Sequence, residues 1–148
     1  MKKFKFSLET VLDYKDQMLN SLRNEHGIIL AAIREQEDVL DRIWDRYREY
    51  NEEFCERKRT GMTAMDAVMY QSALRAQELE IQRETEKLEQ LRTEEEKKRN
   101  EVVEAKKETA SLEKLRERKL DHYNKEIQKA EEQRIEEFVV TQRIMCSA

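Results

Sequence analysis

No proline interrupts this chain of 148 residues, and it contains only two glycines, Gly27 and Gly61. Proline and glycine are the residues that most often end helices and form turns. Only one short stretch, Arg59-Thr60-Gly61-Met62-Thr63, has the composition of a turn. The sequence therefore predicts an all-α protein with a single domain, 1–148. Its two long helices fold back on each other as an antiparallel coiled-coil hairpin, with the C-terminal helix overhanging.

The composition fits this prediction and excludes several classes of protein. Charged residues make up 42% of the chain and hydrophobic residues 38%, a balance typical of long amphipathic helices, although disorder is the competing interpretation. Acidic and basic residues are interleaved, with a net charge of −4 and no basic stripe, so nucleic acid is not an expected partner. No apolar run approaches the ~20 residues that cross a bilayer, so no membrane insertion is expected.

The first half of the chain carries a heptad pattern. We expect a helix over about 7–58, with Ser7 as its N-cap. Two columns of residues form the expected seam, the line along which the two helices pack, and His26 on it is interpreted as a buried polar residue that fixes the register. One column is Leu12, Leu19, His26, Ile33, Leu40, Tyr47 and Phe54, and the other is Leu8, Lys15, Leu22, Ile29, Gln36, Ile43 and Tyr50.

The second helix is expected over about 64–145, after a turn at about 59–63. Thr63 is placed to cap it, with Asp66 three residues later. Its seam is less apolar, and beyond Leu112 the phase slips by about one residue, which alters the local supercoil. The residues that keep the heptad before that point are Leu74, Ile81, Leu88, Leu91, Val102, Ala105 and Leu112.

Folding the chain about Gly61 sets Tyr50 opposite Leu74 and Phe54 opposite Tyr70. Because the first helix ends near Ser7, the second is expected to overhang by roughly 30 residues, or about 45 Å. This overhang, from about Glu117 to the C-terminus, is expected to lack an intramolecular partner. An unpaired apolar stripe of this kind favours a partner or a self-association face. Its apolar residues are Tyr123, Ile127, Ile135, Phe138, Val139 and Val140.

Residues for catalysis are sparse, so we do not expect an enzyme, a metal site or a cofactor. His26 and His122 form no helical ligand pair, and no glycine-rich phosphate loop exists. Cys55 and Cys146 lack activating neighbours and are expected to be free thiols at opposite ends of the hairpin. Trp44 falls off the seam, where a large exposed ring favours a partner.

Two short motifs carry a family resemblance. The opening Phe4-Lys5-Phe6-Ser7-Leu8-Glu9-Thr10-Val11-Leu12 resembles the start of FliJ, the small cytoplasmic coiled-coil protein of bacterial flagellar export. The stretch Leu112-Glu113-Lys114-Leu115-Arg116-Glu117-Arg118, then Tyr123, then Glu131-Glu132-Gln133-Arg134-Ile135-Glu136-Glu137, is similar to the C-terminal helix of that family. One position departs from the motif, because Glu136 stands where the family pattern has Asp before Glu.

The resemblance implies a non-enzymatic protein, cytoplasmic and peripheral to the membrane at the flagellar type III export apparatus, with a hairpin like the central-stalk subunit of rotary ATPases. It implies that the end with both termini enters a hexameric export ATPase and promotes ring assembly. The turn-proximal half then contacts the export gate membrane protein and export chaperones. The ATPase-facing residues implied are Phe4, Phe6, Leu8, Arg116, Arg118, Tyr123, Glu132 and Gln133. The gate- or chaperone-facing residues implied are Ile43, Tyr47, Tyr50, Tyr70 and Leu74.

Two other classes of function stay open at this point. One is a generic coiled-coil scaffold that homodimerises through the overhang, and the other is a holdase-type chaperone that binds unfolded clients at its tip. A nucleic-acid-binding arm is the least favoured, since its basic stripe is missing.

Overall fold

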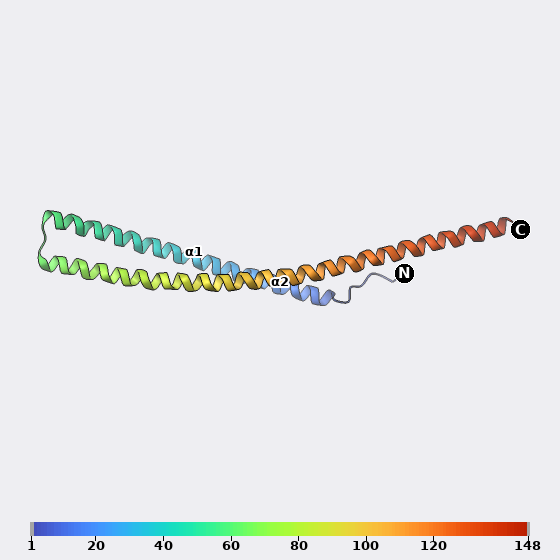
Figure 1. Cartoon of the computed structure of the whole chain (residues 1–148), viewed down its shortest axis with the longest axis horizontal. Coiled ribbons are helices and arrows are strands. Elements are labelled where there is room, and N and C mark those ends of the chain that lie inside the picture. Colours follow the sequence, from blue (N-terminus) through green and yellow to red (C-terminus); the bar gives the residue numbers. More distant parts are fainter. Residues whose placement is uncertain (1, 148) are drawn as a thin grey trace. The chain divides into compact units, whose positions relative to one another are not determined.

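The fold is an all-α helical hairpin, as the sequence predicts. The computed structural model describes residues 2–147, and its two helices are α1, Glu9–Thr60, and α2, Ala64–Cys146 (Figure 1). The first helix begins two residues after the expected Ser7 and continues two residues beyond 58. The connection is correspondingly shorter than expected, at residues 61–63.

The turn is made by the two residue types that the sequence singles out. Gly61 has a φ of +108°, a conformation that residues with a Cβ rarely adopt, and its N–H donates to the Arg57 carbonyl at 2.9 Å. Thr63 then caps α2, because its Oγ1 accepts the N–H of Asp66 at 3.2 Å. The expected glycine turn and threonine cap are both confirmed.

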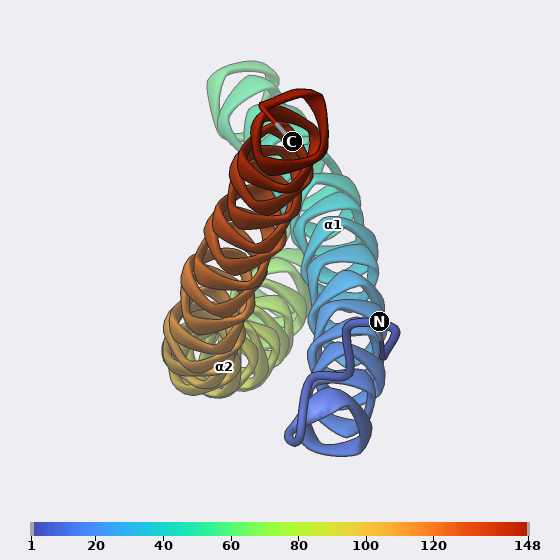
Figure 2. The ribbon, with the colours of Figure 1, turned by 90° about the vertical axis from the view of Figure 1, so that its right-hand side faces the viewer.

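The chain divides into two units, which we name the turn unit, Ser21–Val102, and the terminal unit, formed by residues 2–20 with 103–147. In the turn unit α1 and α2 lie side by side, and the predicted opposition of Phe54 and Tyr70 is confirmed by stacked rings with centroids 5.2 Å apart (Figures 1 and 2). Tyr50 also packs on Tyr70, at 4.9 Å. The buried core of this unit consists of Leu40, Ile43, Phe54, Tyr70, Leu74, Ile81 and Leu88.

The heptad pattern predicts burial correctly along α1. Every residue of the two expected columns, from Leu8 to Phe54, is buried or half-buried, while the residues between them are mostly exposed. This includes the three polar members, Lys15, His26 and Gln36. A 3-4 spacing suffices here because one straight stripe on α1 faces one neighbouring helix.

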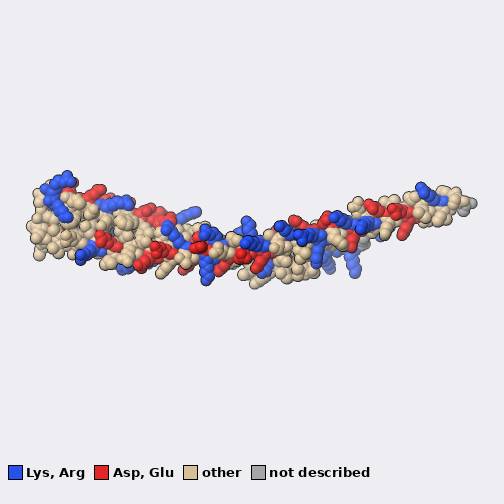
Figure 3. Space-filling model, in the orientation of Figure 1, with Lys and Arg blue, Asp and Glu red and all other residues tan. Residues whose placement is uncertain are grey.

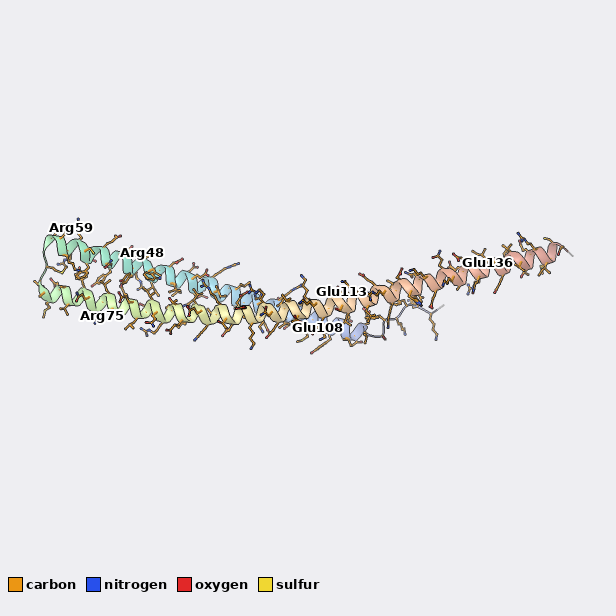
Figure 4. The ribbon with its side chains drawn as sticks, viewed as in Figure 1. Arg48, Arg59, Arg75, Glu108, Glu113 and Glu136 are labelled. Carbon is orange, nitrogen blue, oxygen red and sulfur yellow. The ribbon has the colours of Figure 1, made fainter. Side chains whose placement is uncertain are left out.

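The terminal unit corrects the expected overhang. Residues 2–8, which we call the strap, precede α1 without helical structure and lie against α2, where Phe6 is only 7% exposed. The strap covers α2 as far as Tyr123 and Glu126, so the segment after Glu117 does have an intramolecular partner. A bare helix begins only at Glu131, and every described residue from there to Ser147 is exposed. Glu136, labelled in Figure 4, lies on this bare segment.

The surface of both units is strongly and evenly charged. Figure 3 shows lysines and arginines interleaved with aspartates and glutamates, and uncharged side chains gathered near the turn. Neither of the described helices contains a stretch with the length and hydropathy needed to span a bilayer.

Candidate partner-binding surfaces

The strap is attached to α2 by aromatic and charged contacts. The Phe4 ring lies 5.6 Å from that of Tyr123 and 5.9 Å from the Arg116 guanidinium, a cation–π distance. The Tyr123 hydroxyl donates a hydrogen bond to the Lys2 carbonyl. Arg116 also pairs with Glu9 at 2.9 Å, which ties the start of α1 to the same place on α2. Two phenylalanines in an irregular segment thus replace a third turn-by-turn helix contact.

The structure brings together most of the residues that the resemblance assigns to the ATPase. Phe4, Phe6, Arg116 and Tyr123 meet at the strap, and Leu8 is half-buried at its end. Arg118 is exposed on the neighbouring surface of α2. The remaining two, Glu132 and Gln133, lie farther along α2 and are exposed on its bare segment.

Lysines surround the strap and make this surface basic. Lys2, Lys3 and Lys5 line a hollow together with Lys119, His122 and Glu126 of α2. The Lys119 ammonium lies 5.8 Å from the centre of the Phe6 ring. The sequence analysis missed this concentration because the interleaved charges of the two segments only add up once the strap lies against α2.

The bare segment of α2, residues 131–147, carries the largest set of apolar side chains without a covering helix. A soluble monomer rarely leaves several large apolar side chains together on one segment. The exposed fractions are 63% for Ile135, 63% for Phe138, 41% for Val139, 54% for Val140, 65% for Ile144 and 75% for Met145.

The residues that the resemblance assigns to the gate and chaperones lie mostly inside the turn unit. Ile43, Tyr70 and Leu74 are buried between α1 and α2, so a partner can reach only Tyr47 and Tyr50, which are half-buried. The Tyr47 hydroxyl donates to Glu78 at 2.9 Å, and this hydrogen bond to a carboxylate raises the pKa of Tyr47. These side chains hold the helices together beneath any surface that a partner would contact.

The exposed apolar surface of the turn unit comes from other residues. Met65, Val68, Met69 and Leu79 follow one another along the first turns of α2 and are 59–75% exposed. The sequence analysis missed them because none falls on the seam. Trp44 on α1 is 40% exposed, as expected, and packs edge-on against Tyr47 at 5.7 Å.

Polar pairs in the seam of the turn unit set which residues face each other. His26 Nε2 lies 2.9 Å from Glu95 Oε1, and Gln36 donates to the Glu84 carboxylate at 2.5 Å and to its carbonyl at 3.0 Å. The Gln36 amide, followed by the Lys87 ammonium, holds the pKa of Glu84 below its ordinary value of 4.5. The Lys98 ammonium bonds Glu25 and Glu101, which raises its pKa.

Within residues 2–147, no cluster of histidine, cysteine, aspartate and glutamate could hold a metal ion. Cys55 and Cys146 are exposed free thiols. The surfaces that remain as candidates for function are therefore binding surfaces: the strap with its lysines, the bare segment of α2, and the apolar face beside the turn.

The model of the family described as the flagellar FliJ protein matches residues 4–144. The chain belongs to the FliJ family. The matched range includes the strap, both helices and most of the bare segment, so the resemblance of the two short motifs extends through the chain. FliJ proteins are components of the flagellar export apparatus and are not known as enzymes. Neither the curated proteins nor the solved structures gave a match.

Proposed function

We propose that this FliJ protein binds the hexameric export ATPase through its terminal unit, in the manner of a central stalk. The observation that carries this proposal is the bare segment 131–147, where six large apolar side chains are exposed beside a basic strap. A helix that protrudes without a covering partner can enter a pore lined by several subunits. Its apolar side chains would lose their contact with water there, at about 25 cal/mol per Å² of apolar surface buried.

The proposed mechanism is preferential binding. A single helix cannot contact six identical subunits equally, so it stabilises the closed ring by contacting some subunits better than others. A ligand shifts an assembly equilibrium only by the difference between its affinities for the two states. Binding to the closed ring and not to free subunits would therefore promote assembly and raise ATPase activity.

We further propose that the turn unit contacts the export gate membrane protein and the export chaperones, with the protein cytoplasmic and peripheral to the membrane at the export apparatus. The exposed face of Met65, Val68, Met69 and Leu79 supports a partner site there, since methionines adapt their shape to varied apolar surfaces. In this proposal Tyr47 and Tyr50 contribute their exposed edges, while Ile43, Tyr70 and Leu74 act by holding the helices beneath them.

A pair of matched variants tests the assignment of the two surfaces. Ile135→Asp/Phe138→Asp and Val68→Asp/Met69→Asp each place two carboxylates on exposed positions of α2. We expect the first pair to reduce pull-down of the export ATPase from the same organism and stimulation of its activity by at least about tenfold, because about 1.4 kcal/mol of lost affinity suffices.

The second pair is the control for the first, and the gate and chaperone assays reverse the roles. Val68→Asp/Met69→Asp should leave ATPase stimulation unchanged and weaken capture of the gate cytoplasmic domain. Full ATPase stimulation by Ile135→Asp/Phe138→Asp would overturn the stalk proposal, and the wild type's failure to bind the ATPase would remove it altogether.

A further inference from the structure

The bare segment of α2 and the surface beside the strap carry opposite charges that no described side chain neutralises. Arg118 and Lys119 are exposed on α2 near the strap, and Glu136 and Glu137 are exposed on the bare segment. Within the described chain, none of these four takes part in an ion pair, although thirteen ion pairs are formed elsewhere in it. Both charged pairs lie within the terminal unit.

An apolar stripe runs between these charges. At about 3.6 residues per turn, Leu120, Ile127, Ile135 and Phe138 lie on one side of α2. Leu120 and Ile127 are half-buried, and Ile135 and Phe138 are 63% exposed. By the same helical geometry, Arg118 and Glu136 lie on one flank of the stripe, and Lys119 and Glu137 lie on the other. This is the arrangement of a coiled-coil seam with flanking charges that select a partner.

We propose that the occupant of this stripe is a second copy of the same chain, paired antiparallel about a two-fold axis near Ile127 and Gln128. An axis there brings Glu136 and Glu137 of each copy opposite Arg118 and Lys119 of the other. Ile135 of each copy then faces Leu120 of the other, and the two Ile127 side chains meet at the axis. A parallel pair would instead set each charge against the same charge, which is unfavourable.

The contact is isologous, since the same patch of both copies is used twice, so it closes at a dimer and does not propagate. Two-fold symmetry doubles every favourable contact, giving four interchain ion pairs from four residues. The inference does not rest on the proposed function. It uses the same bare segment, however, so the dimer and the ATPase complex would exclude each other.

Charge reversal with the full chain tests the dimer. We expect sedimentation equilibrium of the purified wild type to show a dimer at low salt, with a dissociation constant that rises as sodium chloride is added. Glu136→Lys/Glu137→Lys and Arg118→Glu/Lys119→Glu should each raise that constant at least tenfold. An equimolar mixture of the two variants should form a heterodimer with near wild-type affinity, because every facing pair is again opposite in charge.

Controls separate this outcome from non-specific charge effects and from a parallel pair. Glu86→Lys/Glu89→Lys makes the same change of charge at exposed positions of the turn unit and should leave the dimer intact. In a Cys55→Ser background, Ala110→Cys should form a disulfide with Cys146 of the second copy, since the axis places these residues opposite each other. A Cys146–Cys146 link in its place, or a monomeric wild type at all salt concentrations, would overturn the proposal. Both measurements use the protein alone, so their failure is distinct from a failure to bind the ATPase.

Discussion

His26 Nε2 lies 2.9 Å from Glu95 Oε1 across the seam of the turn unit, with the two side chains only 21% and 16% exposed. A polar pair inside an otherwise apolar seam aligns the helices because a shift of either one separates the partners. Its contribution to stability is a separate matter, since both groups lose much of their contact with water.

Substituting the histidine alone should therefore destabilise the protein, and substituting both partners should not. His26→Leu leaves Glu95 without its partner and should cost about 1–2 kcal/mol. His26→Leu/Glu95→Leu should recover that loss and raise the melting temperature, as is usual when a buried polar pair becomes apolar. Thermal unfolding followed by circular dichroism checks both. If His26→Leu alone stabilises the protein, the pair does not act as described.

The two glycines should respond to alanine with opposite signs. Gly61→Ala places a Cβ at a φ of +108° and should destabilise the hairpin by about 1 kcal/mol. Gly27→Ala meets no atom within 4 Å in the middle of α1, so it should stabilise the protein by up to about 1 kcal/mol through helix propensity. Chemical denaturation of both variants provides the comparison, and equal effects of one sign would contradict it.

Acid should weaken the turn unit through Glu84. Its pKa in the folded protein lies below the ordinary 4.5, so the unfolded chain binds more protons as the pH falls through this range. The stabilisation is thus complete above the ordinary pKa and is lost as the pH drops through the lower, folded value. Gln36→Leu removes the leading cause of the shift. The melting temperature of this variant should fall less than that of the wild type between about pH 6 and pH 3.

The strap should protect one part of α2 and no other. Phe6→Ala removes a side chain that is 7% exposed and should release the strap, because the lost burial is worth about 1–3 kcal/mol. Hydrogen exchange should then accelerate in residues 114–126 while the turn unit keeps its wild-type rates. Tyr14→Ala, at a residue 59% exposed, is the matched control and should change neither region. Unchanged exchange beside the released strap would show that α2 is stable there without it.

Removal of the bare segment should separate folding from binding. A chain ending at Ala130 keeps all the described contacts of the strap and of the seam, since residues 131–147 are exposed. Its melting temperature should stay within a few degrees of the wild type, while ATPase binding and the proposed dimer should both be lost. A large drop in the melting temperature would mean that the segment stabilises the hairpin after all.

The sequence by itself determined the helices, the turn and the seam of α1. With no proline and with Gly61 as the one glycine between long heptads, no other connection was available, and the 3-4 spacing from Leu8 to Phe54 identified the buried stripe. These features are local, because helix period and turn chemistry depend on residues close together in the chain.

Only the tertiary structure decided where the terminal unit is covered and where it is bare. The strap has no period, so its path over Tyr123 could not be predicted from Phe4 and Phe6, and the expected overhang began fourteen residues too early, at Glu117 instead of Glu131. The same holds for the exposed face of Met65 and Met69 and for the charges that gather beside the strap. Each arises from residues that pack, or fail to pack, against a segment far away in the sequence, and that information is absent from any local pattern.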